Sequence, residues 1–344
     1  MAAATSAESQ MPRASIIICT RDRADSLRRT LASLGRIDRP AGLSVEVIVV
    51  DNASRDDTAE AVRQASLCDA RLKYVSEPAT GQSRARNRGM AAADGDIIVF
   101  IDDDVIPAMD WLGKLCAPIL RDEADAVAGC VRLAPHLIEP WMSASHRDWL
   151  ADTCSIDAAI PSRMVGANMA FSRVVLDRIP AFDVELGPGA LGFGDDTLFS
   201  LQTRAAGFRI VSAFDAVVEH HFMADRLAAD NWVRTARKLG QVDAYISHHW
   251  DHDVWPRPRR GICSSLLKVA RCRLGQLSRK DTPATPELLS AVRSFHAGCH
   301  YLRVRNEPWN YEKRGLVKLT PGPAMAPRAG MIPAEYSANP PSKA

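Results

Sequence analysis

The sequence predicts an α/β protein with a mixed, mainly parallel sheet, helices on both faces of that sheet, and a helical C-terminal extension. Short apolar runs rich in Val and Ile recur at 14–19, 45–50, 72–75 and 96–101, and segments with helical spacing separate them. From about residue 230 onward the pattern is helical only. Continuous apolar strands that alternate with helices are typical of a parallel sheet covered on both faces.

The first half of the chain supplies the clearest elements. The strand "ASIIIC" (14–19) precedes "RDRADSLRRTLASL" (21–34), in which leucines recur at helical spacing. The strand "VEVIVV" (45–50) precedes "SRDDTAEAVRQA", where Ser54 as N-cap and acids in the first turn predict a helix start. "LKYV" (72–75), an arginine-rich helix over 81–93 and "DIIVFI" (96–101) follow in that order.

The second half is less regular, and its pattern sets the predicted domain limits. We expect strands at 124–133, 164–173 and 208–221, with a Gly-rich loop before a helix that starts near 196. We predict a disordered tail over 1–12, an α/β domain over 13–230 and a basic helical extension over 231–319. A Pro/Ala-rich disordered tail over 320–344 completes the chain.

Charge is distributed unevenly along the chain. The 344 residues are 47% apolar and 24% charged, and the net charge is +2. Residues 1–253 carry 27 Lys and Arg against 36 Asp and Glu, whereas residues 254–318 carry 14 against 4. This basic segment predicts contact with an anionic surface such as a membrane. Within it Leu266, Leu267, Ala270, Leu274 and Leu277 form a helical stripe, which either lies on anionic lipid or packs on the body.

Several features point to a cytoplasmic protein. The eight cysteines are scattered without a C-x-x-C, which predicts reduced thiols. The N-terminus lacks the apolar region of a secretory signal, and no apolar run approaches 18 residues. We therefore expect a cytoplasmic location, with peripheral contact at the inner face of the cell membrane through 254–318. The histidine-rich "HHWDHD" (248–253) is interpreted as a solvated helix end.

The stretch "IVFIDDDVIP" (98–107) places three adjacent carboxylates, Asp102, Asp103 and Asp104, after a strand. A calcium loop would need alternating acids and a glycine where Pro107 stands. A phosphate-transferring D-x-D-x-T/V motif does not fit Ile106. A divalent cation that bridges carboxylates to a nucleotide diphosphate fits a crevice at strand ends. A solvated acidic turn is the remaining alternative.

The motifs together resemble family 2 of the inverting nucleotide-sugar glycosyltransferases over about 14–222. They are "SIIICTRDRADSLRRTLASL", "VEVIVVDNASRDDT", "GQSRARNRGMAAADGDIIVFIDDDVIP", "GANMAFSR", "GFGDDTLFSLQTRAAGFRI" and "VEHH", in the order and spacing of that family. The resemblance implies the GT-A fold, which is a Rossmann-like domain around a mixed sheet. It also implies metal-dependent, inverting transfer of a sugar from a nucleoside diphosphate sugar to a hydroxyl acceptor, with Mn²⁺ or Mg²⁺ as cofactor.

The resemblance also implies roles for particular residues. Asp104 and His220 are the implied metal ligands, with Asp103 and His221 as alternatives. Gly166 and Asn168 would lie beside the donor sugar and the acceptor, although a buried strand is an equally good interpretation. The donor nucleotide would meet Thr20, Arg21, Asp51, Arg86, Asp102 and Asp103.

The chemistry of inversion needs a base. In "GFGDDTLFS", Asp196 matches the catalytic Asp of the family, and Asp195 stands where Glu is usual. The acceptor hydroxyl must lose a proton as it attacks, and a well-placed carboxylate contributes roughly 10²–10⁴-fold to such a step. Two acids at a helix start could instead serve the helix dipole.

Two other functions remain open from the sequence. A sugar-phosphate nucleotidyltransferase would have a G-x-G-T-R-like loop after the first strand, which "CTRDRADS" lacks. A non-catalytic scaffold of the same fold would bind nucleotide sugars without turnover. For the enzyme we expect a lipid-linked or saccharide acceptor, a place in cell-envelope, polysaccharide or glycolipid synthesis, and no nucleic-acid partner.

Overall fold

The computed structural model describes residues 11–67, 70–154, 163–276 and 284–319. The tail predicted over 320–344 and nearly all of the tail predicted over 1–12 lie outside these residues. Leu277 of the predicted stripe also lies outside them. Within the described part, no helix has both the length and the apolar character needed to cross a membrane.

One eight-stranded sheet organises the molecule, with the strand order β3-β2-β1-β4-β7-β6-β8-β5. The strands are β1 (Arg13–Thr20), β2 (Ser44–Asp51), β3 (Arg71–Ser76), β4 (Ile97–Asp102), β5 (Val105–Pro107), β6 (Ala126–Leu133), β7 (Asn168–Ser172) and β8 (Ile210–His220). The pairs β1–β2, β1–β4, β2–β3 and β6–β8 are parallel, whereas β4–β7, β6–β7 and β5–β8 are antiparallel. The predicted mixed, mainly parallel sheet is confirmed.

Helices cover both faces of this sheet, as predicted. The α-helices are α1 (Ala24–Leu34), α2 (Thr58–Gln64), α3 (Gln82–Ala92), α4 (Trp111–Leu120), α5 (Ala144–Trp149), α6 (Asp195–Ala205), α7 (Ala229–His249), α8 (Pro258–Gln276) and α9 (Pro286–Val304). Side chains alternate along β1, so Ile16 and Ile18 pack with α1, α2 and α4. Ile17 faces the opposite side, where it shares a cluster with residues of α3 and α6.

The carboxyl ends of β1, β2 and β4 meet at one edge. Thr20 is paired in register with Asp51, and Cys19 with Asp102. Polar residues that follow these strands therefore gather at the same edge, where open α/β sheets bind ligands. About 80 residues separate Thr20 from Asp102, so the sheet brings distant parts of the chain to this edge.

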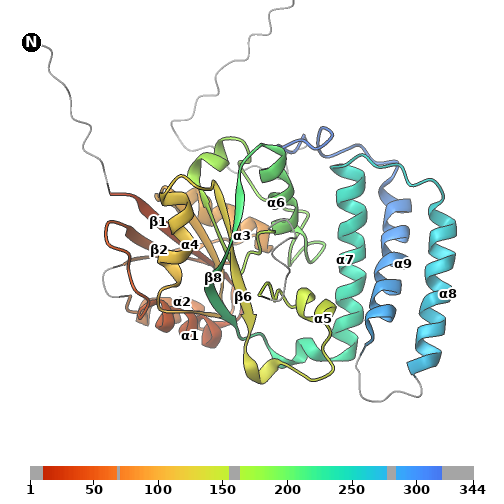
Figure 1. Cartoon of the computed structure of the whole chain (residues 1–344), viewed down its shortest axis with the longest axis horizontal. Coiled ribbons are helices and arrows are strands. Elements are labelled where there is room, and N and C mark those ends of the chain that lie inside the picture. Colours follow the sequence, from red (N-terminus) through yellow and green to blue (C-terminus); the bar gives the residue numbers. More distant parts are fainter. Residues whose placement is uncertain (1–10, 68–69, 155–162, 277–283, 320–344) are drawn as a thin grey trace, which may run out of the picture.

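The C-terminal extension is helical, and α9 lies between α7 and α8 (Figure 1). Trp232 of α7 is buried in a cluster with Leu288 and Val292 of α9. The domain boundary predicted at residue 230 stays a prediction, although α7 packs directly on the catalytic part. For example, Val242 shares a cluster with Leu198 of α6.

A buried carboxylate ties the end of the described chain to the loop before α6. The Asp183 side chain accepts a hydrogen bond from Lys318 Nζ at 2.6 Å. It also accepts hydrogen bonds from the hydroxyls of Tyr245 and Tyr311, at 2.6 and 2.7 Å. Burial raises the pKa of Asp183, but Lys318 and the Tyr245 hydroxyl outweigh burial and hold the pKa below its ordinary value.

Two local expectations are wrong. Cys130 and Cys154 form a disulfide with a Cα–Cα distance of 5.2 Å, so the thiols are not all reduced. The pairing arises because the Thr153 N–H donates to the Val131 carbonyl at 2.9 Å, which lays this segment along β6. In addition, Ser54 does not cap a helix. Helix α2 starts at Thr58, and the Ser54 hydroxyl accepts a hydrogen bond from the Asp22 N–H.

The histidine-rich segment at the end of α7 also differs from its interpretation as a solvated helix end. His248 and His249 are buried, and His248 Nε2 lies 3.1 Å from the Glu307 carbonyl oxygen. Burial, reinforced by His248, lowers the pKa of His249 to about 4. The C-terminal segment after α9 thus covers a helix end that looks polar in sequence.

Candidate active site

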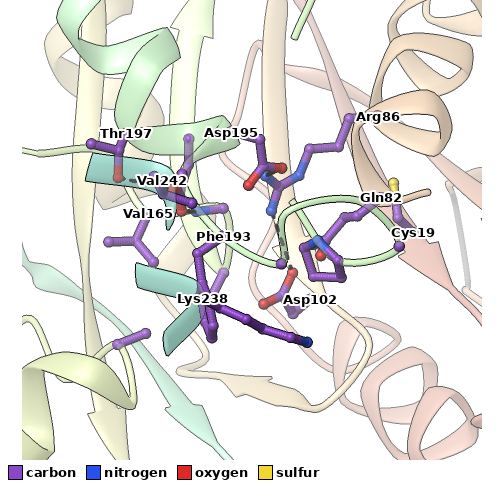
Figure 2. A pocket seen from close by; sticks show the side chains of 18 of the residues that line it. Cys19, Gln82, Arg86, Asp102, Val165, Phe193, Asp195, Thr197, Lys238 and Val242 are labelled. Atoms are coloured by element: carbon purple, nitrogen blue, oxygen red, sulfur yellow. Dashed lines mark hydrogen bonds and ion pairs between the residues drawn. The ribbon is translucent and has the colours of Figure 1, made fainter. Parts of the chain in front are cut away.

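A cavity of about 590 Å³ lies at the carboxyl edge of the sheet, between the strand ends, the start of α6 and helix α7 (Figure 2). Pockets of this size are typical of small-molecule sites. All the predicted site residues line it except Asp51 and Asn168. The sheet therefore brings together residues that are spread over 200 positions of the sequence.

The three adjacent aspartates point to different partners. Asp102, the most exposed of them, has its Oδ1 3.9 Å from Nη2 of Arg86. Asp103 accepts hydrogen bonds from the Thr20 hydroxyl at 2.7 Å and from Arg23 Nη1 at 3.0 Å. Burial raises the pKa of Asp103 to about 7, and Arg23 opposes that rise.

Of the two neighbouring histidines, His220 is the one that faces Asp104. Asp104 Oδ1 is buried, receives no hydrogen bond from the part of the chain that the structure describes, and lies 3.4 Å from His220 Nε2. His221 instead pairs with Glu219 at 2.7 Å. Burial raises the pKa of Asp104, but His220 and then Arg23 outweigh burial and hold the pKa below its ordinary value.

The orientation of His220 suits a cation. Its Nδ1 lies 3.1 Å from the Leu150 carbonyl oxygen, which can only accept, so Nδ1 carries a proton. In the neutral imidazole, Nε2 then presents a lone pair to the Asp104 carboxylate. Two acceptors that face each other need a proton or a metal ion between them. This is the arrangement in which a backbone carbonyl orients a metal-binding histidine.

The structure does not contain a complete metal cage. Among the residues it describes, no group of three or more His, Cys, Asp or Glu side chains is arranged to hold an ion. Mg²⁺ and related ions are often held by only one or two carboxylates together with substrate phosphates. Asp104 and His220 fit that partial set of ligands.

Arg86 and Asp195 form a buried ion pair at the centre of the site. Arg86 Nη1 donates to Asp195 Oδ2 at 2.5 Å, and the two side chains are 4% and 5% exposed. The guanidinium also lies near the rings of Phe100 and Phe182, at 5.8 and 5.4 Å. Burial raises the pKa of Asp195, and Arg86 opposes that rise. Asp195 therefore neutralises and orients Arg86, and it is poorly placed to accept a proton from a ligand.

Asp196 is half-buried and lines the cavity with a carboxylate that no cation holds. Its Oδ2 accepts a hydrogen bond from the Gly166 N–H at 3.1 Å, and the Thr197 hydroxyl lies 3.4 Å from Oδ1. No ion pair to Asp196 occurs within the described ranges. Gly166 is a glycine because a Cβ there would overlap the Arg86 guanidinium. The "GAN" and "GDD" segments thus meet around Arg86.

The Gly-rich loop sets the position of both acids. Gly194, which immediately precedes α6, has φ +89°, a conformation that side chains disfavour. A Cβ at Gly194 would also overlap Val242 of α7. This glycine therefore allows the chain to turn tightly against α7 and begin the helix at Asp195.

The residues predicted to meet a nucleotide do not all line the cavity. Thr20 and Arg21 line the cavity, and Arg21 is exposed beside Asp22. The Asp51 carboxylate is occupied, since it accepts hydrogen bonds from the Ser54 N–H at 2.8 Å and the Tyr74 hydroxyl at 2.7 Å. Its neighbour Asn52 lines the cavity instead.

Asn168 corrects one assignment. It is 0% exposed, and its amide nitrogen donates to the carbonyls of Cys130 and Ala216 at 2.9 and 2.8 Å. Its Oδ1 accepts from the Trp111 indole at 2.9 Å. Asn168 therefore supports the irregularity between β6 and β8 at Gly129 and does not contact a sugar. The buried-strand interpretation is the right one for this residue.

Several cationic residues that line the cavity escaped the sequence prediction, among them Arg23, Arg226 and Lys238. Arg23 Nη1 bridges Asp103 and Asp104, at 3.0 and 2.9 Å. Arg226 and Lys238 line the cavity, and neither forms an ion pair with another described residue. The Lys238 side chain extends from α7 into the cavity (Figure 2). No local pattern marks Lys238, and only the packing of α7 on the Gly-rich loop brings it here.

Comparisons with known proteins find relatives of this chain. A model of Glycosyl transferase family 2 matches residues 15–179. Validoxylamine A glucosyltransferase from Streptomyces hygroscopicus subsp. jinggangensis is 34% identical over 321 residues, which cover 90% of this chain and 71% of that protein. Glycosyltransferase AglE from Haloferax volcanii is 26% identical over 215 residues, 62% of this chain and 68% of that protein.

Among solved structures, the mannosyltransferase PcManGT from Pyrobaculum calidifontis, in complex with GDP-Man and Mn²⁺, has a similar fold. The match has a TM-score of 0.58 and 22% identity, and it covers 86% of this chain and 88% of the other. At this identity, the likeness concerns the fold alone.

Proposed function

Because the chain belongs to glycosyl transferase family 2, we propose that it transfers a sugar with inversion from a nucleoside diphosphate sugar to a hydroxyl acceptor, with a divalent cation. The observation that carries the proposal is the contrast between two neighbouring acids. Asp195 is neutralised by Arg86, whereas the Asp196 carboxylate faces the cavity without a cation.

Asp196 acts as the general base. Inverting transfer is a single displacement in which the acceptor oxygen attacks the anomeric carbon as the bond to the diphosphate breaks. The acceptor proton passes to a carboxylate oxygen of Asp196, which the Gly166 N–H orients. Arg86, fixed by Asp195, borders the donor and holds this wall of the site in place.

Asp104 and His220 are the residues that would hold the cation, since their facing atoms are the acceptors described above. When bound, Mn²⁺ or Mg²⁺ neutralises the charge that develops on the departing diphosphate. The Mn²⁺ and GDP-Man named for the mannosyltransferase of similar fold are consistent with such a site. Arg23, now between Asp103 and Asp104, balances these acids.

The donor is oriented by the strand ends and by α7. Thr20, Arg21, Asp51, Asp102 and Asp103 stand on the nucleotide side in this proposal. The Asp51 carboxylate already accepts hydrogen bonds from the Ser54 N–H and the Tyr74 hydroxyl. In this proposal Asp51 therefore shapes the nucleotide side by holding the end of β2 and does not itself bind the base. Lys238 and Arg226, which form no close ion pair within the described residues, are suited to the diphosphate.

The acceptor belongs to cell-envelope, polysaccharide or glycolipid synthesis and is lipid-linked or a saccharide. The proposal places the enzyme in the cytoplasm, in peripheral contact with the inner face of the membrane. The net positive charge of residues 254–318 supports this location, because anionic lipid attracts basic segments.

Titration calorimetry with UDP and with GDP, each with and without Mn²⁺, tests the proposal. We expect one of them to bind with at least about tenfold higher affinity in the presence of the metal, a difference of about 1.4 kcal/mol. Asp215→Asn removes an exposed acid on β8, outside the cavity. It is the matched control for the aspartate variants of the site and should bind UDP or GDP like the native protein. Equal affinity with and without metal would refute metal dependence. Metal-dependent binding without transfer to any tested acceptor would favour a non-catalytic scaffold.

A further inference from the structure

Helix α8 is the outermost helix of the extension and packs on α9 (Figure 1). Its inward side carries Ile262, Val269 and Cys272. A Cβ at Gly298 of α9 would lie 2.6 Å from the Ile262 side chain, so this glycine permits close packing. The inward side of α8 therefore packs against α9, and the outward side faces away from the protein.

The outward side of α8 is apolar where a soluble helix is usually polar. Leu266, Leu267 and Leu274 are 53%, 61% and 69% exposed. At 3.6 residues per turn, these leucines and Ala270 form one stripe along the helix. Contiguous exposed apolar side chains bordered by polar ones mark interaction sites more often than free surface.

Only basic residues accompany this stripe. Residues 258–276 contain no Asp or Glu, and their charged side chains are Arg259, Arg260, Lys268, Arg271 and Arg273. The helical periodicity places Arg271 on one side of the leucines and Arg273 on the other. None of the five cations forms an ion pair with a described residue. Their charges are thus free to act on something outside the molecule.

We propose that the outward face of α8 docks the protein on an anionic lipid surface, with the leucines in the acyl boundary and the basic residues among the headgroups. Amphipathic helices that lie in a membrane interface have this combination of an apolar stripe and flanking Lys or Arg. The docking itself is argued from α8 alone. Its purpose, which is to hold the enzyme near a lipid-linked acceptor, rests on the proposed function.

Other occupants match the face less well. A second copy that used the same face would set five cations against five cations without an acid between them. The residues over 320–344 carry one acid and two basic side chains, so they offer no complementary charge. An anionic bilayer complements both the leucines and the cations.

Vesicle co-sedimentation of the full chain tests this proposal. We expect binding to phosphatidylcholine–phosphatidylglycerol vesicles that weakens at high salt, and no binding to phosphatidylcholine alone. Replacing Leu267 and Leu274 by Ser should weaken binding about tenfold for each leucine. The matched control changes two exposed apolar residues elsewhere, Leu120→Ser and Val174→Ser, and should bind like the native protein.

A second set of variants tests the charges. The triple change Lys268→Gln, Arg271→Gln and Arg273→Gln should weaken binding about fivefold for each residue. Three exposed arginines elsewhere provide the control, with Gln at Arg63, Arg121 and Arg204. Native UDP or GDP binding by each variant would show that the cavity is intact.

Three outcomes would overturn docking. They are no sedimentation at low salt, unchanged sedimentation of the α8 variants, and a native dimer in sedimentation velocity that the leucine variant lacks. If vesicles bind but neither UDP nor GDP does, the proposed function fails and docking stands. If a nucleotide binds and vesicles do not, the reverse holds.

Discussion

Replacing Asp195 or Asp196 by Asn should have opposite effects. The first change should lower the stability of the fold, and the second should lower the rate of sugar transfer. Asp195→Asn removes the charge that neutralises Arg86, and both side chains are about 95% buried. Breaking a buried ion pair by removing one partner costs roughly 3–5 kcal/mol. The Asp102 carboxylate, 3.9 Å from the Arg86 guanidinium, offsets part of this loss. We therefore expect a loss of about 3 kcal/mol in the free energy of unfolding.

Asp196→Asn should leave stability almost unchanged. The Asp196 carboxylate is only half-buried and accepts one backbone hydrogen bond, from Gly166. An amide oxygen can accept the same bond, so we expect a change of less than about 1 kcal/mol. Sugar transfer should nevertheless fall by roughly 10²–10⁴-fold, because the amide cannot take up the acceptor proton.

Urea denaturation and a transfer assay on both variants measure these effects. A loss of about 3 kcal/mol in Asp195→Asn corresponds to roughly 4 °C in the melting temperature for a chain of this size. Asp215→Asn again serves as the control for the loss of an exposed charge. Native stability of Asp195→Asn would refute the ion-pair argument. Retention of more than about a tenth of the transfer rate by Asp196→Asn would move the base elsewhere.

Three further changes test other parts of the site. Asp104→Ala should abolish the effect of Mn²⁺ on UDP or GDP affinity in calorimetry while the circular dichroism stays native; a retained metal effect would exclude this residue as a ligand. Lys238→Met should weaken UDP or GDP binding about tenfold, since a charge-assisted hydrogen bond contributes about 1.5 kcal/mol, and should spare uridine or guanosine; equal losses for nucleoside and diphosphate would contradict the assignment. Asp183→Asn should cost about 3 kcal/mol at neutral pH. Because the folded pKa of Asp183 is depressed, its contribution is present above the unfolded value of about 4 and is lost as pH falls below it; urea midpoints that keep the full native acid dependence in the variant would contradict this role.

The sequence allowed the sheet to be predicted because its strands carry a local signal. The buried runs over 14–19, 45–50 and 96–101 coincide with β1, β2 and β4 to within a residue or two. The short β5 and the helix α4 were not predicted. Strand β5 has only three residues, too few for any alternation to be recognised.

The residues that line the cavity could be predicted where a motif is local, but not where the position depends on distant segments of the chain. Asp104, Asp196 and His220 all line the cavity. Asn168 also lies in a segment that resembles a motif. Its role, however, depends on hydrogen bonds to carbonyls of β6 and β8, and sequence periodicity does not reveal these contacts. Lys238 lacks a motif altogether.

The same limit explains the disulfide and the buried histidines. Cys130 and Cys154 are 24 residues apart, and only the course of the chain along β6 brings them together. His248 looks solvated in a polar sequence, yet the segment that follows α9 covers it. In both cases the deciding contact is made by residues far away in the chain.

The contact between Lys318 and Asp183 has a practical consequence for anyone who shortens or fuses this protein. A chain cut shortly before Lys318 would keep the Asp183 carboxylate, whose side chain is now 0% exposed, but would remove its only cation among the described residues. Asp183 lies four residues before Gly187, the first glycine of the loop that ends at Asp195 and Asp196. Truncation far from the cavity in sequence would therefore loosen the cavity wall, whereas a tag attached after residue 319 leaves this anchor in place.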